Sequence, residues 1–244
     1  MQVGAGASFA SSGAVSIAAA RTVEAAGTLT LGGGGAASVV NAGTIETTGS
    51  GSLTFAGPLV NTAAIVTDGG TLTVEGAVTG AGHFDINGGT AIFQQAFSDT
   101  VDFAGASVLE LSHAYSGKVT GLSAAGTNAI VLLDVAFEGV TTAAYSGSTT
   151  SGVLTVTEGA STAAIHLKGD YTPGSFVLSQ AAGGGTEIID PAAAGRSAAA
   201  AHAFIAAVAG FGASAAGPAG GGEDARRLQP ATLVAPGLTR PAMA

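Results

Sequence analysis

The chain has 244 residues, of which only 9% are charged, and glycine alone occupies 40 positions. It contains no cysteine, which excludes disulfide bonds, thiolate zinc sites and a cysteine nucleophile. Its net charge is −9, and residues 1–190 hold 14 acidic residues against three basic ones, Arg21, Lys118 and Lys168, so we expect no nucleic acid as a partner.

Residues 1–111 are predicted to form the coils of a right-handed parallel β-helix, an all-β solenoid. A short strand pattern recurs along this segment, with successive copies beginning at positions 51, 70, 89 and 107. The resulting period near 19 matches one coil of about three short strands and three turns. The copies that begin at positions 27 and 51 are further apart, so we expect a longer turn or a skipped strand between them.

Alternation within the strands assigns each side chain to a face. Residues i and i+2 share one face of a strand, so Leu53 and Phe55 point one way and Thr54 the other. A shift of one coil period places Leu72 over Leu53, which predicts an apolar interior and an outer ladder of threonines. The residues predicted to point inward are Leu53, Phe55, Leu72, Val74, Phe84 and Leu109.

Residues 112–190 are expected to supply the last coils and an antiparallel hairpin cap. The sequence of residues 152–167 has two strand patterns around the turn EGAS, and residues 172–179 and 183–190 make another strand–turn–strand. A cap is expected because the open end of a solenoid exposes unpaired strand edges.

Beyond residue 190 the composition shifts to alanine, glycine and proline. Residues 191–212 are predicted to contain a short helix, because Phe204, Val208 and Phe211 recur on one helical face. Residues 213–244 are predicted to be disordered, since few large apolar groups are available to offset the entropy of ordering. This C-terminal tail is a candidate contact for secretion machinery.

The N-terminal sequence has no Lys or Arg before Arg21 and so lacks the charged region of a signal peptide. No stretch of about 18 apolar residues is free of glycine or polar breaks, so we expect no membrane span. Because strand-like sequence begins at once, we expect the chain to be the C-terminal piece of a longer protein or a truncated reading frame.

Residues 112–190 resemble a segment of large, repetitive exoproteins of alphaproteobacteria. In that family the last stretch usually carries an Asp-Gly-His-Gly-Gly-Thr turn; here the glycines and Thr186 remain, but the Asp and the His are lost. The N-terminal repeats resemble β-strand-repeat adhesins and autotransporter passengers. The resemblance implies secretion or surface display and no defined reaction. Its matching elements are SHAYSGKVTGL (112–122), Asp134 with Phe137, the hairpin segment 152–171, and SFVLSQAAGGGTEIID (175–190).

Three carboxylates are the strongest candidates for chemistry. Asp85, Asp102 and Glu110 each occupy the fourth position of a strand pattern and are predicted to stack as an acidic stripe on one outer face. Polysaccharide lyases and hydrolases built on β-helices use such groups as acid, base or calcium ligand. A lyase also needs a cation, and only Lys118 is near in the sequence. A solvated strand face is therefore the preferred interpretation.

The histidines and loop motifs give weaker signals. His83 and Asp85 share a strand face and could bind a metal or act as a base, but the sequence supplies no third group. His113 and His166 are isolated. The calcium-binding nonapeptide, the G-x-S-x-G elbow and the phosphate loop are all missing. We therefore predict no catalytic, cofactor-binding or metal-binding residues.

The leading hypothesis is a non-enzymatic structural or adhesive β-solenoid, extracellular or on a bacterial cell surface, with glycans or cell-surface components as partners. One alternative is a carbohydrate-active β-helix enzyme, a lyase or hydrolase. The absence of tryptophan and the low number of Lys and Arg residues, seven in all, favour the rod over a sugar-binding cleft. The other alternative is a secretion-related C-terminal module of a larger exoprotein.

Overall fold

The computed structural model describes residues 1–33, 37–112, 114–172 and 174–190. Every regular element in these ranges is a β-strand, so the all-β prediction is confirmed for them. The predicted helix in 191–212 and the predicted disordered tail, 213–244, lie outside the described residues, as does His113.

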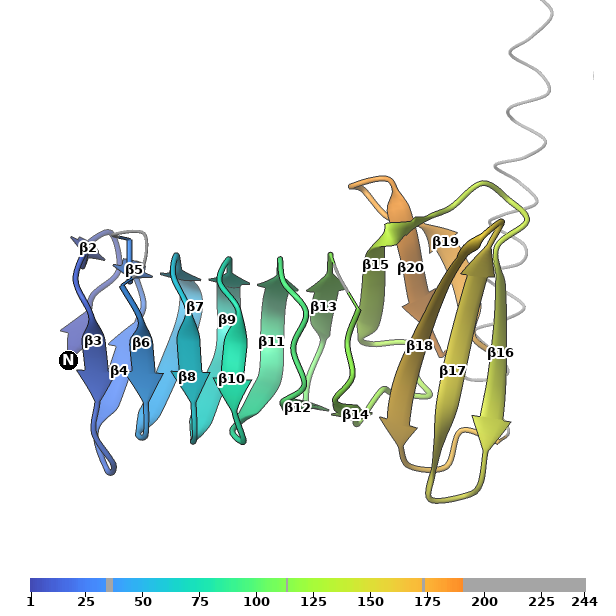
Figure 1. Ribbon diagram of the computed structural model, residues 1–244, viewed down its shortest axis with the longest axis horizontal. Coiled ribbons are helices and arrows are strands. Elements are labelled where there is room, and N and C mark those ends of the chain that lie inside the picture. Colours follow the sequence, from blue (N-terminus) through green and yellow to red (C-terminus); the bar gives the residue numbers. More distant parts are fainter. Residues whose placement is uncertain (34–36, 113, 173, 191–244) are drawn as a thin grey trace, which may run out of the picture. The chain divides into compact units, whose positions relative to one another are not determined.

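Parallel strands stack coil upon coil along one axis, as Figure 1 shows. The first face of the stack is a ladder in which each strand pairs in parallel with its counterpart in the next coil. The predicted solenoid of stacked coils is therefore confirmed. The first-face strands are β1 (Gln2–Val3), β4 (Thr22–Ala25), the N-terminal parts of β7 (Thr44–Phe55), β9 (Ala64–Val74) and β11 (His83–Phe93), then β12 (Thr100–Phe103) and β14 (Lys118–Thr120).

The second face follows the first after a corner, and the third face closes each coil. The second face contains β2 (Ser8–Ala10), β5 (Thr28–Leu31), the C-terminal parts of β7, β9 and β11, β13 (Ser107–Leu111) and β15 (Ala129–Ala136). The third face is a separate four-stranded sheet of β3 (Val15–Ile17), β6 (Val39–Asn41), β8 (Leu59–Asn61) and β10 (Val78–Gly80), continued by a bridge between Phe97 and Tyr115.

Glycines form the corner between the first two faces, where β7, β9 and β11 bend without ending. Gly70 has φ of +71° and Gly89 has φ of +74°, in the left-handed region that glycine adopts without strain. A Cβ on Gly70 would lie 2.1 Å from the carbonyl oxygen of Gly51 in the preceding coil. Only glycine lets successive corners approach this closely.

The register confirms the period that the sequence indicated. Leu53 pairs with Leu72 and Phe55 with Val74, as a shift of one coil period requires. The longer interval between the copies at positions 27 and 51 is a longer turn and not a skipped strand, because Leu29 pairs directly with Leu53. Most of the additional residues lie between β5 and β6, and one lies inside β7, at the register shift between Gly49 and Ser52.

The interior of the stack is mainly apolar, with a few buried polar side chains such as Asn41, Asn61 and Asp99. All six residues predicted to point inward, Leu53, Phe55, Leu72, Val74, Phe84 and Leu109, have no exposed surface. Aromatic rings fill the later coils: Phe93 stacks on Phe97 with centroids 3.9 Å apart, and Phe84 meets Phe93 edge to face at 4.8 Å. The outward Thr54 and Thr73 are opposite each other and partly exposed.

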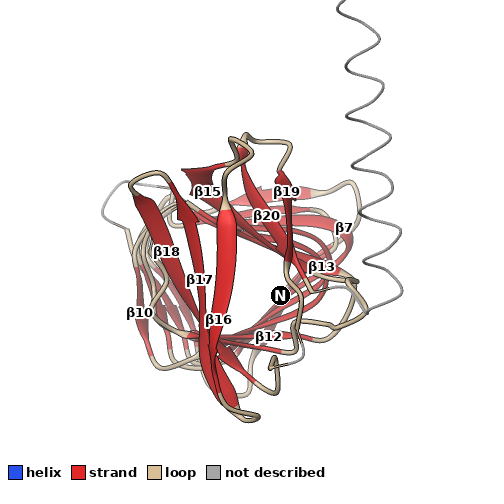
Figure 2. Ribbon diagram, turned by 90° about the vertical axis from the view of Figure 1, so that its right-hand side faces the viewer, coloured by secondary structure: helices blue, strands red, loops and turns tan. Residues whose placement is uncertain are grey.

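The last strands run antiparallel. β16 (Thr142–Gly147), β17 (Ser151–Glu158) and β18 (Ser161–Lys168) form a meander, and β18 continues the first face because it pairs in parallel with β14. On the second face, β20 (Gly185–Ile189) pairs antiparallel with β15 and with β19 (Val177–Gln180). Figure 2 looks along the stack with these strands in the foreground.

Candidate ligand-binding site

Two of the three carboxylates of the predicted acidic stripe lie together. Asp85 on β11 is directly opposite Asp102 on β12, and both side chains are on the outer surface of the first face. Glu110 is not part of this stripe: it lies on β13, opposite Ile92 and Val131, on the second face. The prediction of one stripe is wrong for Glu110 because the chain turns a corner between Phe103 and Ser107, and residues beyond the corner face another direction.

The acidic column of the first face also includes residues from earlier coils. Glu24 is opposite Glu46, and Glu46 is followed in register by Val66 and then by Asp85. Burial raises the pKa of Asp85 above its ordinary value, His83 opposes that rise, and Asp102 adds to it. Burial also raises the pKa of Glu110. Asp85 and Glu110 therefore both lie on the outer surface of the solenoid, on different faces.

The predicted pair of His83 and Asp85 is present on that face. The Nε2 atom of His83 lies 3.5 Å from Oδ2 of Asp85, and the two side chains are 46% and 33% exposed. Among the described residues, no group of three or more His, Asp and Glu side chains is placed to hold a metal ion. The pair therefore supplies two of the ligands that a metal needs, and no described acid or histidine adds a third.

A basic cluster follows the acidic column on the same face. Lys118 on β14 lies opposite His166 on β18, and Thr120 lies opposite Lys168. The residues between them, Val119 and Leu167, are buried, so alternation turns Lys118, His166 and Lys168 outward, where all three are exposed. We call these three residues the basic cluster.

Sequence reasoning missed this cluster and treated His166 as isolated. The separation of Lys118 from His166 along the chain is no multiple of the coil period, because β15, β16 and β17 intervene between β14 and β18. The available signal was charge: apart from Arg21, these lysines are the only Lys and Arg residues before residue 191.

The basic cluster borders a hollow of about 390 Å³. Ser151 lies opposite Lys168, and Val153 lies opposite His166, so β17 forms the far side of the hollow. Within the described ranges neither lysine has a carboxylate oxygen within ion-pair distance, since the His83–Asp85 pair is the one such contact there. The hollow is lined by Lys118, Thr150, Ser151, Gly152, Val153, His166, Leu167 and Lys168.

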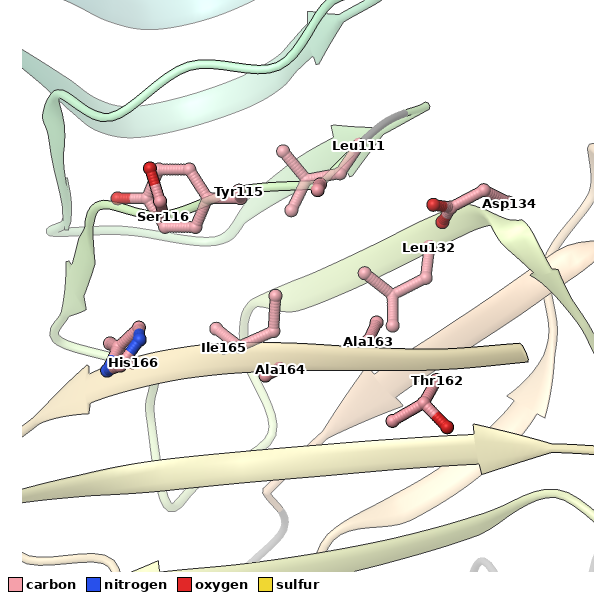
Figure 3. A pocket seen from close by; sticks show the side chains of 11 residues that line it. Leu111, Tyr115, Ser116, Leu132, Asp134, Thr162, Ala163, Ala164, Ile165 and His166 are labelled. Carbon is pink, nitrogen blue, oxygen red and sulfur yellow. The ribbon is translucent and has the colours of Figure 1, made fainter. Parts of the chain in front are cut away.

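A second hollow of about 320 Å³ is also lined by His166 and lies between the last coil and β18 (Figure 3). Ser116, Asp134 and His166 line it, which are residue types that a nucleophilic hydrolase combines. Figure 3 shows Ser116 and His166 near one end and Asp134 at the other. No hydrogen bond or ion pair among the described residues joins these three side chains. Such catalysis needs a nucleophile hydrogen-bonded to a base, and a third group that orients the base. The three side chains do not form that arrangement here.

Comparison with known proteins gives no match to a family model, to a curated protein or to a solved structure. Within the described part of the chain, no helix has the length and hydropathy that crossing a bilayer requires.

Proposed function

We propose that this chain is a non-catalytic structural or adhesive module of a bacterial exoprotein, displayed outside the cell and able to bind glycans or cell-surface components. The observation that carries this proposal is the coil-to-coil register. From Thr22 to Phe103 the strands of each coil pair in register with those of the coil before. The chain therefore forms a rod on which equivalent outward-facing positions recur in every coil.

The surface chemistry of the rod supports display more than turnover. Its outer second face is rich in hydroxyl groups, with Thr54 and Thr73 in one column and Ser52 and Thr71 in the next. Its carboxylates are divided between two faces, so Glu110 is not available to act with Asp85 and Asp102. A carbohydrate-active β-helix would need acids and a cation converging on one cleft.

We further propose that the solenoid winds right-handed and that the antiparallel strands from β16 to β20 cap its C-terminal end. Parallel crossover connections within one sheet are right-handed in nearly all proteins. The pairing of β18 with β14 and of β20 with β15 covers strand edges that would otherwise be open to association with other chains.

The composition supports an exported chain: it has no cysteine and few charges. A secretion-related role for residues 191–244 is the alternative that the sequence favours, because their composition differs from that of the rod.

The test is binding without turnover. Purified full-length protein is incubated with bacterial cells and with immobilised uronic-acid, sulfated and neutral polysaccharides, and retention is measured together with the release of reducing ends. Retention without product is expected. If product forms, and if Asp85→Asn or Asp102→Asn abolishes its formation, the proposal is wrong and the chain is a carbohydrate-active enzyme.

A further inference from the structure

We infer that the basic cluster, Lys118, His166 and Lys168, binds the anionic groups of an acidic polysaccharide, the carboxylates of uronic acids or the sulfates of sulfated sugars. This inference rests on the proposed adhesive function and names its ligand class. It depends on the position of the cluster, on the hollow beside it and on the charge of the surrounding face.

The positions of the charges set the geometry of the site. Neighbouring strands of a sheet lie about 4.8 Å apart, so Lys118 and the opposing His166 are separated by about one strand spacing. Lys168 lies two positions further along β18 on the same outer side. Two ammonium groups on flexible stems and an imidazole can therefore converge over one anionic group.

The hollow supplies neutral hydrogen-bonding groups next to these charges. Thr150 and Ser151, which both carry hydroxyls, line it, and Ser148 Oγ lies 3.1 Å from Thr150 Oγ1 at the hairpin turn. A saccharide offers both chemistries at once, an anionic substituent and adjacent hydroxyls. The residues that line the hollow include no Phe, Tyr or Trp, so we expect binding to come from charge and hydrogen bonds more than from stacking on a sugar ring.

The surroundings favour a ligand with sparse charge. Asp102 lies opposite Thr120, immediately beside the cluster on the same face, and Asp85 follows it. Double-stranded DNA carries about one charge per 1.7 Å of its axis, and such a polymer lying on this face would place phosphates over both aspartates. A polysaccharide separates its anionic groups by neutral hydroxyls, so it can place an anionic group on the lysines and leave hydroxyls over the acids.

The test uses the full chain at about 0.1 M salt, where charges further than about 10 Å from the site are largely screened. Binding to three immobilised polymers is measured by biolayer interferometry: polyguluronate for uronic acids, dextran sulfate for sulfated sugars, and unmodified dextran as the neutral polymer. Wild-type protein is expected to bind at least one of the two acidic polymers and to prefer it over dextran. The better acidic polymer identifies the anionic group.

Variants then locate the site. The double change Lys118→Ala and Lys168→Ala is expected to weaken acidic-polymer binding by about tenfold or more, which corresponds to about 1.4 kcal/mol. Arg21→Ala removes one basic charge just before β4, several coils away along the stack, and should leave binding unchanged. Asp102→Asn removes the neighbouring negative charge and should strengthen binding. Thermal melting of each variant checks that the fold is intact.

The outcomes separate this inference from the proposed function. If the double-lysine variant folds and binds acidic polymers as well as the wild type does, or if dextran binds equally well, the inference is overturned while the adhesive function stands. If none of the polymers binds, the inference is overturned, and the proposed function then rests on the cell-binding measurement alone. Turnover that depends on Asp85 would overturn the proposed adhesive function and, with it, the adhesive role inferred for the basic cluster, even if the double-lysine variant binds less polymer.

Discussion

The side-chain amide of Asn61 donates a hydrogen bond from Nδ2 to Oδ2 of Asp99, at 3.1 Å, although the two residues are 38 positions apart. Asn61 stacks in register on Asn41. Nδ2 of Asn41 donates a hydrogen bond to Oδ1 of Asn61 at 2.9 Å. The next coil has Gly80 at this position and so offers no side chain to continue the ladder. A Cβ on Gly82 would lie 2.3 Å from Nδ2 of Asn61, so glycine there leaves the space through which the amide reaches Asp99.

This contact places a carboxyl group inside the stack. Asp99 is only 4% exposed. Burial raises its pKa above the ordinary value, while the hydrogen bond from Asn61 and the charge of His83 act in the opposite direction. The buried polar ladder therefore ends on a titratable group whose charged form is stabilised mainly by one amide.

Replacing Asn61 with aspartate should destabilise the protein in a pH-dependent way. At pH 7 the Asn61→Asp variant would bring two buried carboxylates together, with an expected loss on the order of 3 kcal/mol in the free energy of unfolding. Near pH 4 one of the pair can be protonated and donate to the other, so much of the loss should be recovered. Urea unfolding at both pH values measures the difference.

Asn61→Ala is the matched control, because it loses the same hydrogen bonds without adding a charge. It should be destabilised more at pH 7 than near pH 4, because the charged form of Asp99 loses its amide donor, but its pH dependence should be smaller than that of Asn61→Asp. Equal pH dependence of the two variants would mean that position 61 does not face Asp99.

The wild-type protein should become more stable as the pH falls from 7 toward about 4. Burial raises the pKa values of Asp85, Asp99 and Glu110. A carboxyl group with a raised pKa in the folded state binds its proton more tightly there, so the folded state gains stability as the pH falls through the folded pKa. The gain is complete below the unfolded value of about 4.

Thermal melting across this range is the measurement. Asp170 has a lowered pKa because Thr172 donates a hydrogen bond to it. The stability that comes from this lowered pKa is lost only as the pH falls below the pKa of the unfolded state. A melting temperature that fell steadily from pH 7 to pH 5 would contradict the assigned burial of the three carboxyl groups. Asp99→Asn should reduce the slope, since the variant removes one of them.

Two neighbouring substitutions test which side of a strand faces the interior. Leu72 has no exposed surface, and Leu72→Asp would place an unpaired charge in a dry interior, at an expected cost on the order of 3–5 kcal/mol. Thr73 is on the outer side, and Thr73→Asp should change stability by about 0.5 kcal/mol or less. Equal changes in the thermal melts of the two variants would show that the assigned facing is wrong.

The interior ladder could be predicted from the sequence because it follows from two periods. Alternation placed Leu53 and Phe55 on one side of a strand, and the coil period aligned them with Leu72 and Val74. Both signals are local and repeat in every coil, so neither needs knowledge of distant contacts. The longer interval that follows β5 was also visible, although only the register distinguished a longer turn from a skipped strand.

The features that the sequence did not predict depend on corners and on departures from the period. Glu110 has the same place in its strand pattern as Asp85, yet a corner turns it to another face. His166 reaches Lys118 through an intervening antiparallel meander. Asp99 meets Asn61 because Gly82 leaves space for the amide, a steric relationship that pattern and composition do not encode.

The buried hydroxyl of Thr67 makes a stabilising substitution possible at that position. Thr47 and Thr67 occupy the same inward position in consecutive coils, and both are fully buried. Oγ1 of Thr47 donates to the carbonyl oxygen of Gly69 at 2.9 Å, whereas Oγ1 of Thr67 has no hydrogen-bond partner among the described residues. The difference coincides with a register shift after Ile86, which breaks the repeat at the place where Thr67 would find the equivalent carbonyl.

Thr67→Val should therefore raise the free energy of unfolding by about 1 kcal/mol, because valine keeps the shape of the side chain and removes a buried hydroxyl that lacks a partner. Thr47→Val makes the same chemical change where the hydroxyl is bonded, and it leaves the carbonyl of Gly69 without that donor. It should lower stability by about 1 kcal/mol. Urea unfolding of the two variants, with equal m-values, measures the contrast. If both variants lost stability equally, Thr67 would have to be hydrogen-bonded in solution, and the register shift after Ile86 would not be the reason for the difference between the two coils.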